Sequence, residues 1–338
     1  MVGPVIRVGI AVLVATLALL AGCGEREESG GGGRTQGFTL ALDWFPNPDH
    51  AGIYAGLDRG YFEEAGLDVE PQVPSDPAAP IKQVAAGRVD LAVSYEPEVL
   101  LAREEGLDVV AVGALAHTPL TSLASLGKDA ITNPRELDGK RVATAGIPYQ
   151  DAFLDAILRD AGLRPDDAEQ VDVGLNLLSP LIAGRVDAVL GLFWNIEGVQ
   201  LERRGDNPTV TPVDDLGIPT YDELVLVAKG DRVAEDPEAI RLFLAALERG
   251  TREAADNPSL ATRGLVDANQ DLDPKLTGAQ VSKTLPALLP RRGEGYGRMD
   301  PASWREFAGF MVDEELLDSL PAIDDVLTNE LLPGKIPE

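Results

Sequence analysis

Cysteine and histidine are almost absent from this chain of 338 residues, which contains one cysteine and two histidines. The single cysteine, Cys23, cannot form a disulfide within the chain, so stability has to come from packing. His50 and His117 are far apart in the sequence, and no pair of metal-type ligands recurs at zinc-site spacing. We therefore expect neither a metal centre nor a cofactor.

Three signatures of enzyme active sites are also missing. The sequence has no phosphate-binding loop, no G-x-G-x-x-G after an expected strand and no G-x-S-x-G elbow. Basic residues are scarce too, with 29 lysines and arginines against 56 aspartates and glutamates and a formal net charge of −27. Such acidity argues against a nucleic-acid partner, because nucleic acid needs a basic surface. These absences favour a protein that binds a small molecule over a catalyst.

The N-terminus carries the one long apolar run. Arg7 precedes the apolar segment Val8–Leu19, and small residues lead to Cys23. The run is too short for a mature membrane-spanning helix and is typical of a bacterial lipoprotein signal. We expect residues 1–22 to be a signal peptide and Cys23 to carry lipid; the alternative is an ordinary secretory signal with a chance cysteine. The glycine-rich residues 23–37 are expected to be a flexible linker, so the body would be extracytoplasmic and anchored to the cell membrane.

The rest of the chain alternates between strand and helix patterns. Strands are expected at 38–42, 67–70, 89–93, 109–112, 122–126, 141–144 and 224–228. Helices are expected at 48–58, 80–86, 98–105, 151–161, 237–257, 259–268, 279–289 and 301–314. This alternation predicts an α/β fold with a largely parallel sheet.

A short segment occurs twice. Ala183–Val189 repeats the pattern of Ala86–Ala92, in which a helix ends at glycine and a charged turn leads into a buried strand. The repeat predicts two lobes of similar plan that face one cleft, although the unit is common enough to recur by coincidence. The expected lobes are 38–118 with 226–338, and 119–225, joined by chain crossings near His117 and Tyr221.

Aromatic and acidic residues lie at the expected strand ends, where ligands bind in open α/β sheets. Trp44, Tyr95 and Trp194 could stack on a flat heterocycle, and Glu96 and Glu197 could accept hydrogen bonds from its N–H groups. Each of these residues could instead serve the core or a solvated helix.

Five further candidates have equally plain structural alternatives. Asn47 could be a helix N-cap before Pro48, and His50 in the first helical turn a surface residue. Gly146 and Tyr149 lie in a loop before the expected helix at 151–161, whose free N–H groups favour an anionic or carbonyl group, although Tyr149 could instead be a packing residue. Tyr221 could be a ligand contact or a packing residue.

The segment Leu42–Tyr54, LDWFPNPDHAGIY, resembles the thiamine-pyrimidine-precursor binding proteins of bacterial ABC importers, within the NMT1/THI5-like group. Gly60–Val69, Val89–Glu96 and Phe193–Glu197 resemble further segments of the group. The resemblance implies a two-lobed type II periplasmic-binding-protein fold, an aminopyrimidine solute, an ABC permease partner and a monomer. The family's usual glycine-rich loop with tryptophan reads Ala145–Tyr149 here, AGIPY, which departs from the pattern.

Other ligands and one enzyme class remain as alternatives. Riboflavin would also use aromatic faces, whereas a sulfonate or nitrate would call for arginine or lysine, which the candidate segments lack. Eukaryotic relatives in the group are pyrimidine synthases that consume their own histidine and carry a cysteine-rich segment. Residues 94–98 contain no histidine, and the candidate segments contain no lysine for a Schiff base.

Overall fold

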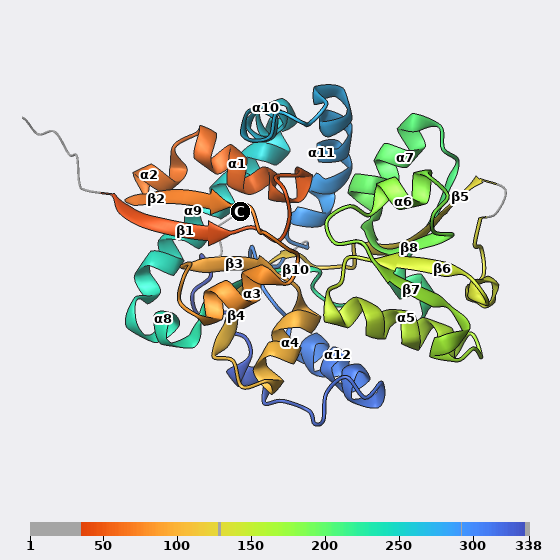
Figure 1. The fold of residues 1–338 in the computed structure, drawn as a ribbon. Coiled ribbons are helices and arrows are strands. Elements are labelled where there is room, and N and C mark those ends of the chain that lie inside the picture. The colour runs from red at the N-terminus through yellow and green to blue at the C-terminus, as the bar shows by residue number, and fades with distance from the viewer. Residues whose placement is uncertain (1–34, 128–129, 292, 335–338) are drawn as a thin grey trace, which may run out of the picture. The chain divides into compact units, whose positions relative to one another are not determined.

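The computed structural model describes residues 35–127, 130–291 and 293–334 (Figure 1). The expected signal peptide and Cys23 lie outside these residues. No helix in the described part is long and apolar enough to cross a membrane.

The first sheet has the strand order β2-β1-β3-β10-β4. Its strands are β1 (Gln36–Ala41), β2 (Leu67–Gln72), β3 (Leu91–Ser94), β4 (Val109–Ala116) and β10 (Leu224–Lys229). β1 pairs in parallel with β2 and β3, whereas β10 runs antiparallel to β3 and β4. Every residue of β3 is buried, as expected for a strand covered on both faces.

Helices from both ends of the chain cover this sheet. They are α1 (Ala51–Asp58), α2 (Tyr61–Glu64), α3 (Ala79–Ala85), α4 (Glu96–Glu104), α8 (Gly230–Glu235), α9 (Pro237–Asp256), α10 (Pro258–Ala268), α11 (Pro274–Leu288) and α12 (Pro301–Asp313). A 3₁₀ turn, η1 (Pro48–His50), precedes α1, so the expected helix 48–58 begins with a tighter turn. Helices α1 and α9 meet at glycine: a Cβ on Gly250 would lie 2.2 Å from the Gly52 carbonyl oxygen.

The second sheet follows the same plan, with the order β7-β6-β8-β5-β9. Its strands are β5 (Thr121–Leu126), β6 (Arg141–Thr144), β7 (Glu169–Asp172), β8 (Ala188–Phe193) and β9 (Pro208–Pro212). Its longer helices are α5 (Pro148–Asp160), α6 (Leu178–Ile182) and α7 (Val199–Arg204), with a π-helical turn, η5 (Trp194–Gly198), after β8. Strands β7, β6 and β8 are parallel, and β5 is antiparallel to β8 and β9.

The repeated segment has the same role in both sheets. Each copy leads into the third strand, β3 or β8, and its aspartate bonds to the strand beside it. Asp90 accepts from the Thr39 N–H at 2.7 Å, and Asp187 accepts from the Arg141 N–H at 2.8 Å. The two aspartates therefore fix equivalent strand registers.

Several elements differ from the sequence expectation. The sheets are mixed rather than largely parallel, because each includes a reversed strand, β10 or β5, next to the point where the chain passes between the sheets. β7 (EQVD) and β9 (PTVTP) were not expected, since these edge strands lack a continuous apolar face. β1 begins at Gln36, inside the expected linker, because backbone pairing from Gln36 to Leu67 needs no apolar side chain.

Glu223 connects the two chain segments that pass between the sheets. Its buried carboxylate accepts hydrogen bonds from the backbone N–H groups of Leu120 (2.7 Å) and Thr121 (2.8 Å). It also accepts from the hydroxyls of Thr121 (2.9 Å) and Tyr221 (3.0 Å). Burial raises the pKa of Glu223 to about 7, against the pull of these donors. One side chain thus satisfies the polar groups of both crossings.

Replacing Glu223 should destabilise the fold. Glu223→Ala leaves two buried N–H groups and two hydroxyls without their acceptor, so we expect the free energy of unfolding to fall by about 2–4 kcal/mol. Urea denaturation of the purified protein measures this change. Glu235→Ala, at the exposed end of α8, serves as the control and should change stability by less than about 0.5 kcal/mol. Equal stability of the two variants would contradict the role given to Glu223.

Candidate functional site

A pocket with about 430 Å³ of space, part of it open to solvent, receives residues from both sheets. Its lining is Asp43, Trp44, Asn47, Tyr95, Ile147, Gln150, Leu177, Gly191, Phe193, Ile196 and Glu197. The first four follow strands of the first sheet, and the others belong to elements of the second. The pocket therefore lies where a bound solute would contact both halves of the fold.

Three aromatic residues supply its rings. Trp44 follows the end of β1, Tyr95 follows β3 directly and Phe193 ends β8. These strands run parallel to a neighbour in their own sheets, and their carboxyl ends are the usual ligand-binding edge of such sheets. The arrangement suits a flat ring, because aromatic faces and edges contribute about 0.5–1.5 kcal/mol per pair beyond area burial.

Asp43 is the central carboxylate on the first side. Its Oδ1 lies 2.8 Å from His50 Nε2, and its Oδ2 accepts from the Tyr95 hydroxyl at 2.8 Å. His50 Nδ1 accepts from the Asn47 N–H at 3.3 Å, so Nε2 is the ring nitrogen that donates to Asp43. His50 is fully buried behind Asp43 and positions it rather than lining the pocket.

Asn47 has two roles that the sequence left as alternatives. Its side-chain oxygen accepts from the Asp49 N–H at 2.8 Å, which makes it the N-cap of η1, and it also lines the pocket. The cap holds its amide in a fixed position beside Trp44.

Glu197 and Gln150 provide the polar groups of the second side. Glu197 Oε2 accepts from the Phe193 N–H at 3.0 Å, and burial raises the pKa of Glu197. Gln150 Oε1 accepts from the Ala145 N–H at 2.8 Å. Glycine is required at 191, where φ is +110° and a Cβ would lie 2.5 Å from Gln150 Nε2. The described lining thus contains two carboxylates and neither lysine nor arginine.

A set of hydrogen bonds ties the two sides together behind the pocket. Asn195 Nδ2 donates to Asp49 Oδ1 at 2.7 Å and to Thr284 Oγ1 at 2.8 Å. Gln280 Nε2 donates to the Ile196 carbonyl at 2.9 Å. These bonds hold η5, which carries Glu197, against η1 and α11. Burial raises the pKa of Asp49 well above its usual value.

The structure places three of the predicted residues beside the pocket rather than in its lining. Trp194 donates from Nε1 to the Pro119 carbonyl at 3.1 Å, while Gly191 and Phe193, two residues apart on one face of β8, line the pocket. Gly146 lies against Asp172, whose Oδ2 would be 2.5 Å from an added Cβ. Tyr149 is buried with its ring centroid 5.5 Å from that of Tyr95.

Glu96 and Tyr221 lie at the chain crossings instead. Glu96 Oε2 accepts from the Asp222 N–H at 2.7 Å, and the Tyr221 hydroxyl donates to Glu223. Both line a second cavity. The sequence did not lead us to expect Gln150 and Phe193 in the pocket lining. Phe193 is next to the predicted Trp194, and the alternation of side chains along the strand could have selected it.

The family model described as "NMT1/THI5 like" matches residues 47–261, which is more than half of the chain. The chain belongs to the NMT1/THI5-like family. A thiamine biosynthesis protein of Haemophilus influenzae is 35% identical over 85% of this chain and 90% of its own length. A formylaminopyrimidine-binding protein of Halalkalibacterium halodurans is 31% identical over 86% of this chain and 89% of its own.

The NMT1/THI5-like family also includes enzymes. A 4-amino-5-hydroxymethyl-2-methylpyrimidine phosphate synthase of Saccharomyces cerevisiae is 26% identical over 74% of this chain and 76% of its own. Among solved structures, the alkanesulfonate-binding protein SsuA of Xanthomonas axonopodis pv. citri superposes with a TM-score of 0.70 at 15% identity. This match covers 88% of this chain and 99% of the SsuA chain. The nitrate-binding protein NrtA of Synechocystis gives a TM-score of 0.66 at 14% identity over 88% and 87%. The fold is therefore the two-lobed periplasmic-binding-protein fold.

This member of the NMT1/THI5-like family also buries a carboxyl next to the pocket wall. Glu98 accepts a hydrogen bond from the Ser94 hydroxyl, and burial raises its pKa to about 7 from the usual 4.5. Between these two values the folded chain holds a proton that the unfolded chain releases. The stability from the neutral carboxyl is therefore present at low pH and decreases as pH rises from about 4.5 to 7.

Glu98→Gln should flatten this pH dependence. A glutamine stays neutral, and a shift of one pKa unit corresponds to about 1.4 kcal/mol. Between pH 5 and pH 8, the free energy of unfolding should fall in both proteins. We expect the fall in the variant to be about 2 kcal/mol smaller than in the wild type. Urea denaturation across this range measures the slope of the free energy of unfolding against pH. Glu223, whose pKa is also raised, contributes equally to this slope in both proteins. Glu105→Gln, at the exposed end of the same helix, should keep the wild-type slope, and an unchanged slope in Glu98→Gln would refute the assignment.

Proposed function

We propose that this protein is the extracytoplasmic solute receptor of an ABC importer and binds a thiamine-precursor aminopyrimidine in the pocket of Trp44 and Glu197. The observation that carries the proposal is the pocket's composition: three aromatic rings, two carboxylates and no cationic side chain among the described lining residues. An aminopyrimidine offers a flat face for the rings and N–H donors for the carboxylates. Charge-assisted hydrogen bonds of this kind are roughly twice as strong as neutral ones.

Lobe closure is the proposed mechanism of capture. We propose lobes of 38–118 with 224–338, and 119–223. The expected boundary at 225/226 moves to just before Leu224, because the whole of β10 pairs with strands of the first sheet. The solute would contact Asp43 and Trp44 on one side and Phe193 and Glu197 on the other. Contacts available only when the lobes meet give the solute a higher affinity for the closed form, so it shifts the population towards closure. The closed form would deliver the solute to the permease.

The pocket's charge distinguishes this solute from a sulfonate or nitrate. Oxyanions are recognised by arginine or lysine and by helix N-termini, whereas Asp43 and Glu197 would repel them. A likeness in fold to SsuA and NrtA carries no ligand with it, because both are under 25% identical to this chain.

A binding role is also favoured over synthase activity. The relatives with the highest identities reported above, at 35% and 31%, are a thiamine biosynthesis protein and a binding protein, while the synthase is 26% identical. The resemblance implies that a synthase of this group would carry a histidine near residues 94–98, and these residues contain none. We expect the purified protein to form no 4-amino-5-hydroxymethyl-2-methylpyrimidine phosphate, the product named for these synthases.

Cys23 is the proposed site of lipid attachment, and residues 1–22 of the chain are the proposed signal peptide. Labelling of the producing cells with radioactive palmitate should mark the wild-type protein and leave Cys23→Ser unlabelled. Equal labelling of the two proteins, or no label in either, would refute lipid attachment at Cys23.

A thermal-melting panel tests the solute class. The panel holds hydroxymethylpyrimidine, formylaminopyrimidine, thiamine, riboflavin and an alkanesulfonate. A ligand at a hundredfold excess over its dissociation constant should add about 2.7 kcal/mol of stability, and we expect this from the aminopyrimidines. A shift with riboflavin or the sulfonate alone would reject the proposed solute.

Substitutions then locate the site. Trp44→Ala should weaken aminopyrimidine binding about tenfold or more by removing a ring face, and Glu197→Gln about tenfold by removing a charged acceptor. Isothermal titration calorimetry measures both. Phe45→Ala is the matched control, because Phe45 is next to Trp44 but exposed and outside the lining. Wild-type affinity in both Trp44→Ala and Glu197→Gln would place the solute elsewhere.

A further inference from the structure

A second cavity, with about 700 Å³ of space partly open to solvent, lies beside the chain crossings. It shares no lining residue with the pocket described above. Its lining is Glu96, His117, Thr220, Tyr221, Asp222, Arg291, Glu294, Arg298, Asp300 and Ser303. Unlike the first pocket, it combines cationic and anionic side chains.

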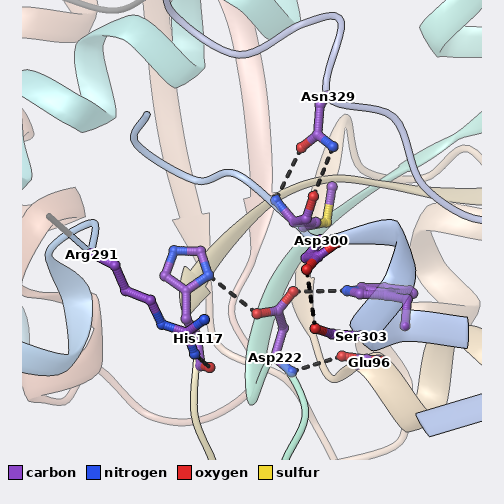
Figure 2. A network of polar contacts seen from close by, with 9 residues as sticks. Glu96, His117, Asp222, Arg291, Asp300, Ser303 and Asn329 are labelled. Carbon is purple, nitrogen blue, oxygen red and sulfur yellow. Dashed lines mark hydrogen bonds and ion pairs between the residues drawn. The ribbon is translucent and has the colours of Figure 1, made fainter. Parts of the chain in front are cut away.

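The buried lining residues Glu96, Tyr221 and Asp222 form the floor of the cavity, and Asp222 lies at the centre of a network of polar contacts (Figure 2). Its Oδ1 lies 3.1 Å from His117 Nδ1, and its Oδ2 accepts from Trp304 Nε1 at 2.7 Å. Its backbone N–H donates to Glu96 Oε2 at 2.7 Å. Both oxygens of Asp222 are therefore occupied, and the floor joins the two crossings to α4 and α12.

Glu96 is the unsatisfied group in this network. It is 1% exposed, and its Oε1 has no hydrogen-bond partner among the described residues. An unpaired buried acceptor costs about 1–3 kcal/mol, so such groups usually have a partner. Because Glu96 lines the cavity, a molecule inside it can supply that partner. Burial and the charge of Asp222 raise the pKa of Glu96, and a cationic donor would offset both effects.

The rim carries two arginines beside two carboxylates. Arg291 and Arg298 are exposed at the cavity mouth, and Arg291 donates to the His117 carbonyl at 3.2 Å. The rim carboxylate of Asp300 is engaged in capping α12, where its Oδ1 accepts from the Ala302 N–H at 2.9 Å. Glu294 is exposed to solvent. Two guanidinium groups thus remain to bind an anionic group.

We propose that this cavity is a second binding site for a small zwitterion of the α-amino-acid class. The ammonium group donates to Glu96 Oε1 on the floor, and the carboxylate binds Arg291 and Arg298 at the rim. The occupant contacts residues of both chain crossings, His117 and Asp222.

Trp304 provides a local reporter for the test. The chain has three tryptophans, so a Trp44→Phe, Trp194→Phe double variant leaves Trp304, which bonds to Asp222, as the only one. This protein is titrated with the common α-amino acids to millimolar concentration, and with matched amines and carboxylic acids that carry only one of the two groups. We expect a saturable fluorescence change with at least one amino acid and an affinity at least about tenfold weaker for its single-ended analogues.

Substitutions in the same background locate the zwitterion. Glu96→Gln and Arg291→Ala should each weaken binding about tenfold or more. Glu98→Gln is the matched control, because Glu98 is a buried glutamate on the same helix that does not line the cavity. The absence of a saturable response to every amino acid would mean that the cavity holds solvent only. A saturable response that is unchanged in Glu96→Gln would mean that the amino acid binds without Glu96, and either result overturns the proposal. Aminopyrimidine binding is measured separately on the wild type, so the two proposals can fail independently.

Discussion

The buried carboxylate of Glu223 holds together the two segments through which the chain passes between its sheets. It accepts from Leu120 and Thr121 on the first crossing and from Tyr221 on the second. Each crossing leads into a reversed strand, β5 or β10, so this contact lies at the start of one strand in each sheet. A pocket that needs side chains from both sheets depends on it. The burial that raises the pKa of Glu223 is offset by a full set of donors.

Within the pocket, hydrogen bonds from neighbouring groups likewise hold the two carboxylates in place. Asp43 keeps its place because His50 and Tyr95 each bond one of its oxygens. Glu197 bonds to the Phe193 N–H at the end of β8. Both acids are thus positioned by neighbours before any solute arrives, which lowers the cost of ordering them on binding. At the cavity floor, Glu96 keeps one buried oxygen without a hydrogen-bond partner among the described residues.

Sequence reasoning reached the α/β class, the family and the equivalence of the two repeated segments, because buried strands and glycine-ended helices leave clear local patterns. Edge strands such as β7 and β9 have no apolar run, so their pairing could not be read locally. At the site, Trp44, Asn47, Tyr95 and Glu197 line the pocket, whereas Trp194 and Glu96 turn elsewhere. Which of two adjacent side chains faces a ligand depends on the exact end of a strand, and that end is set by partners distant in sequence, such as Leu120 for Trp194.

The central claim is that a thiamine-precursor aminopyrimidine binds between the two sheets. A crystal structure of the protein with hydroxymethylpyrimidine tests it most directly. We expect the pyrimidine ring to contact Trp44 and Phe193, with its amino group within hydrogen-bond distance of Asp43 or Glu197. Electron density for the pyrimidine at another place, or an empty pocket at saturating ligand, would contradict the account.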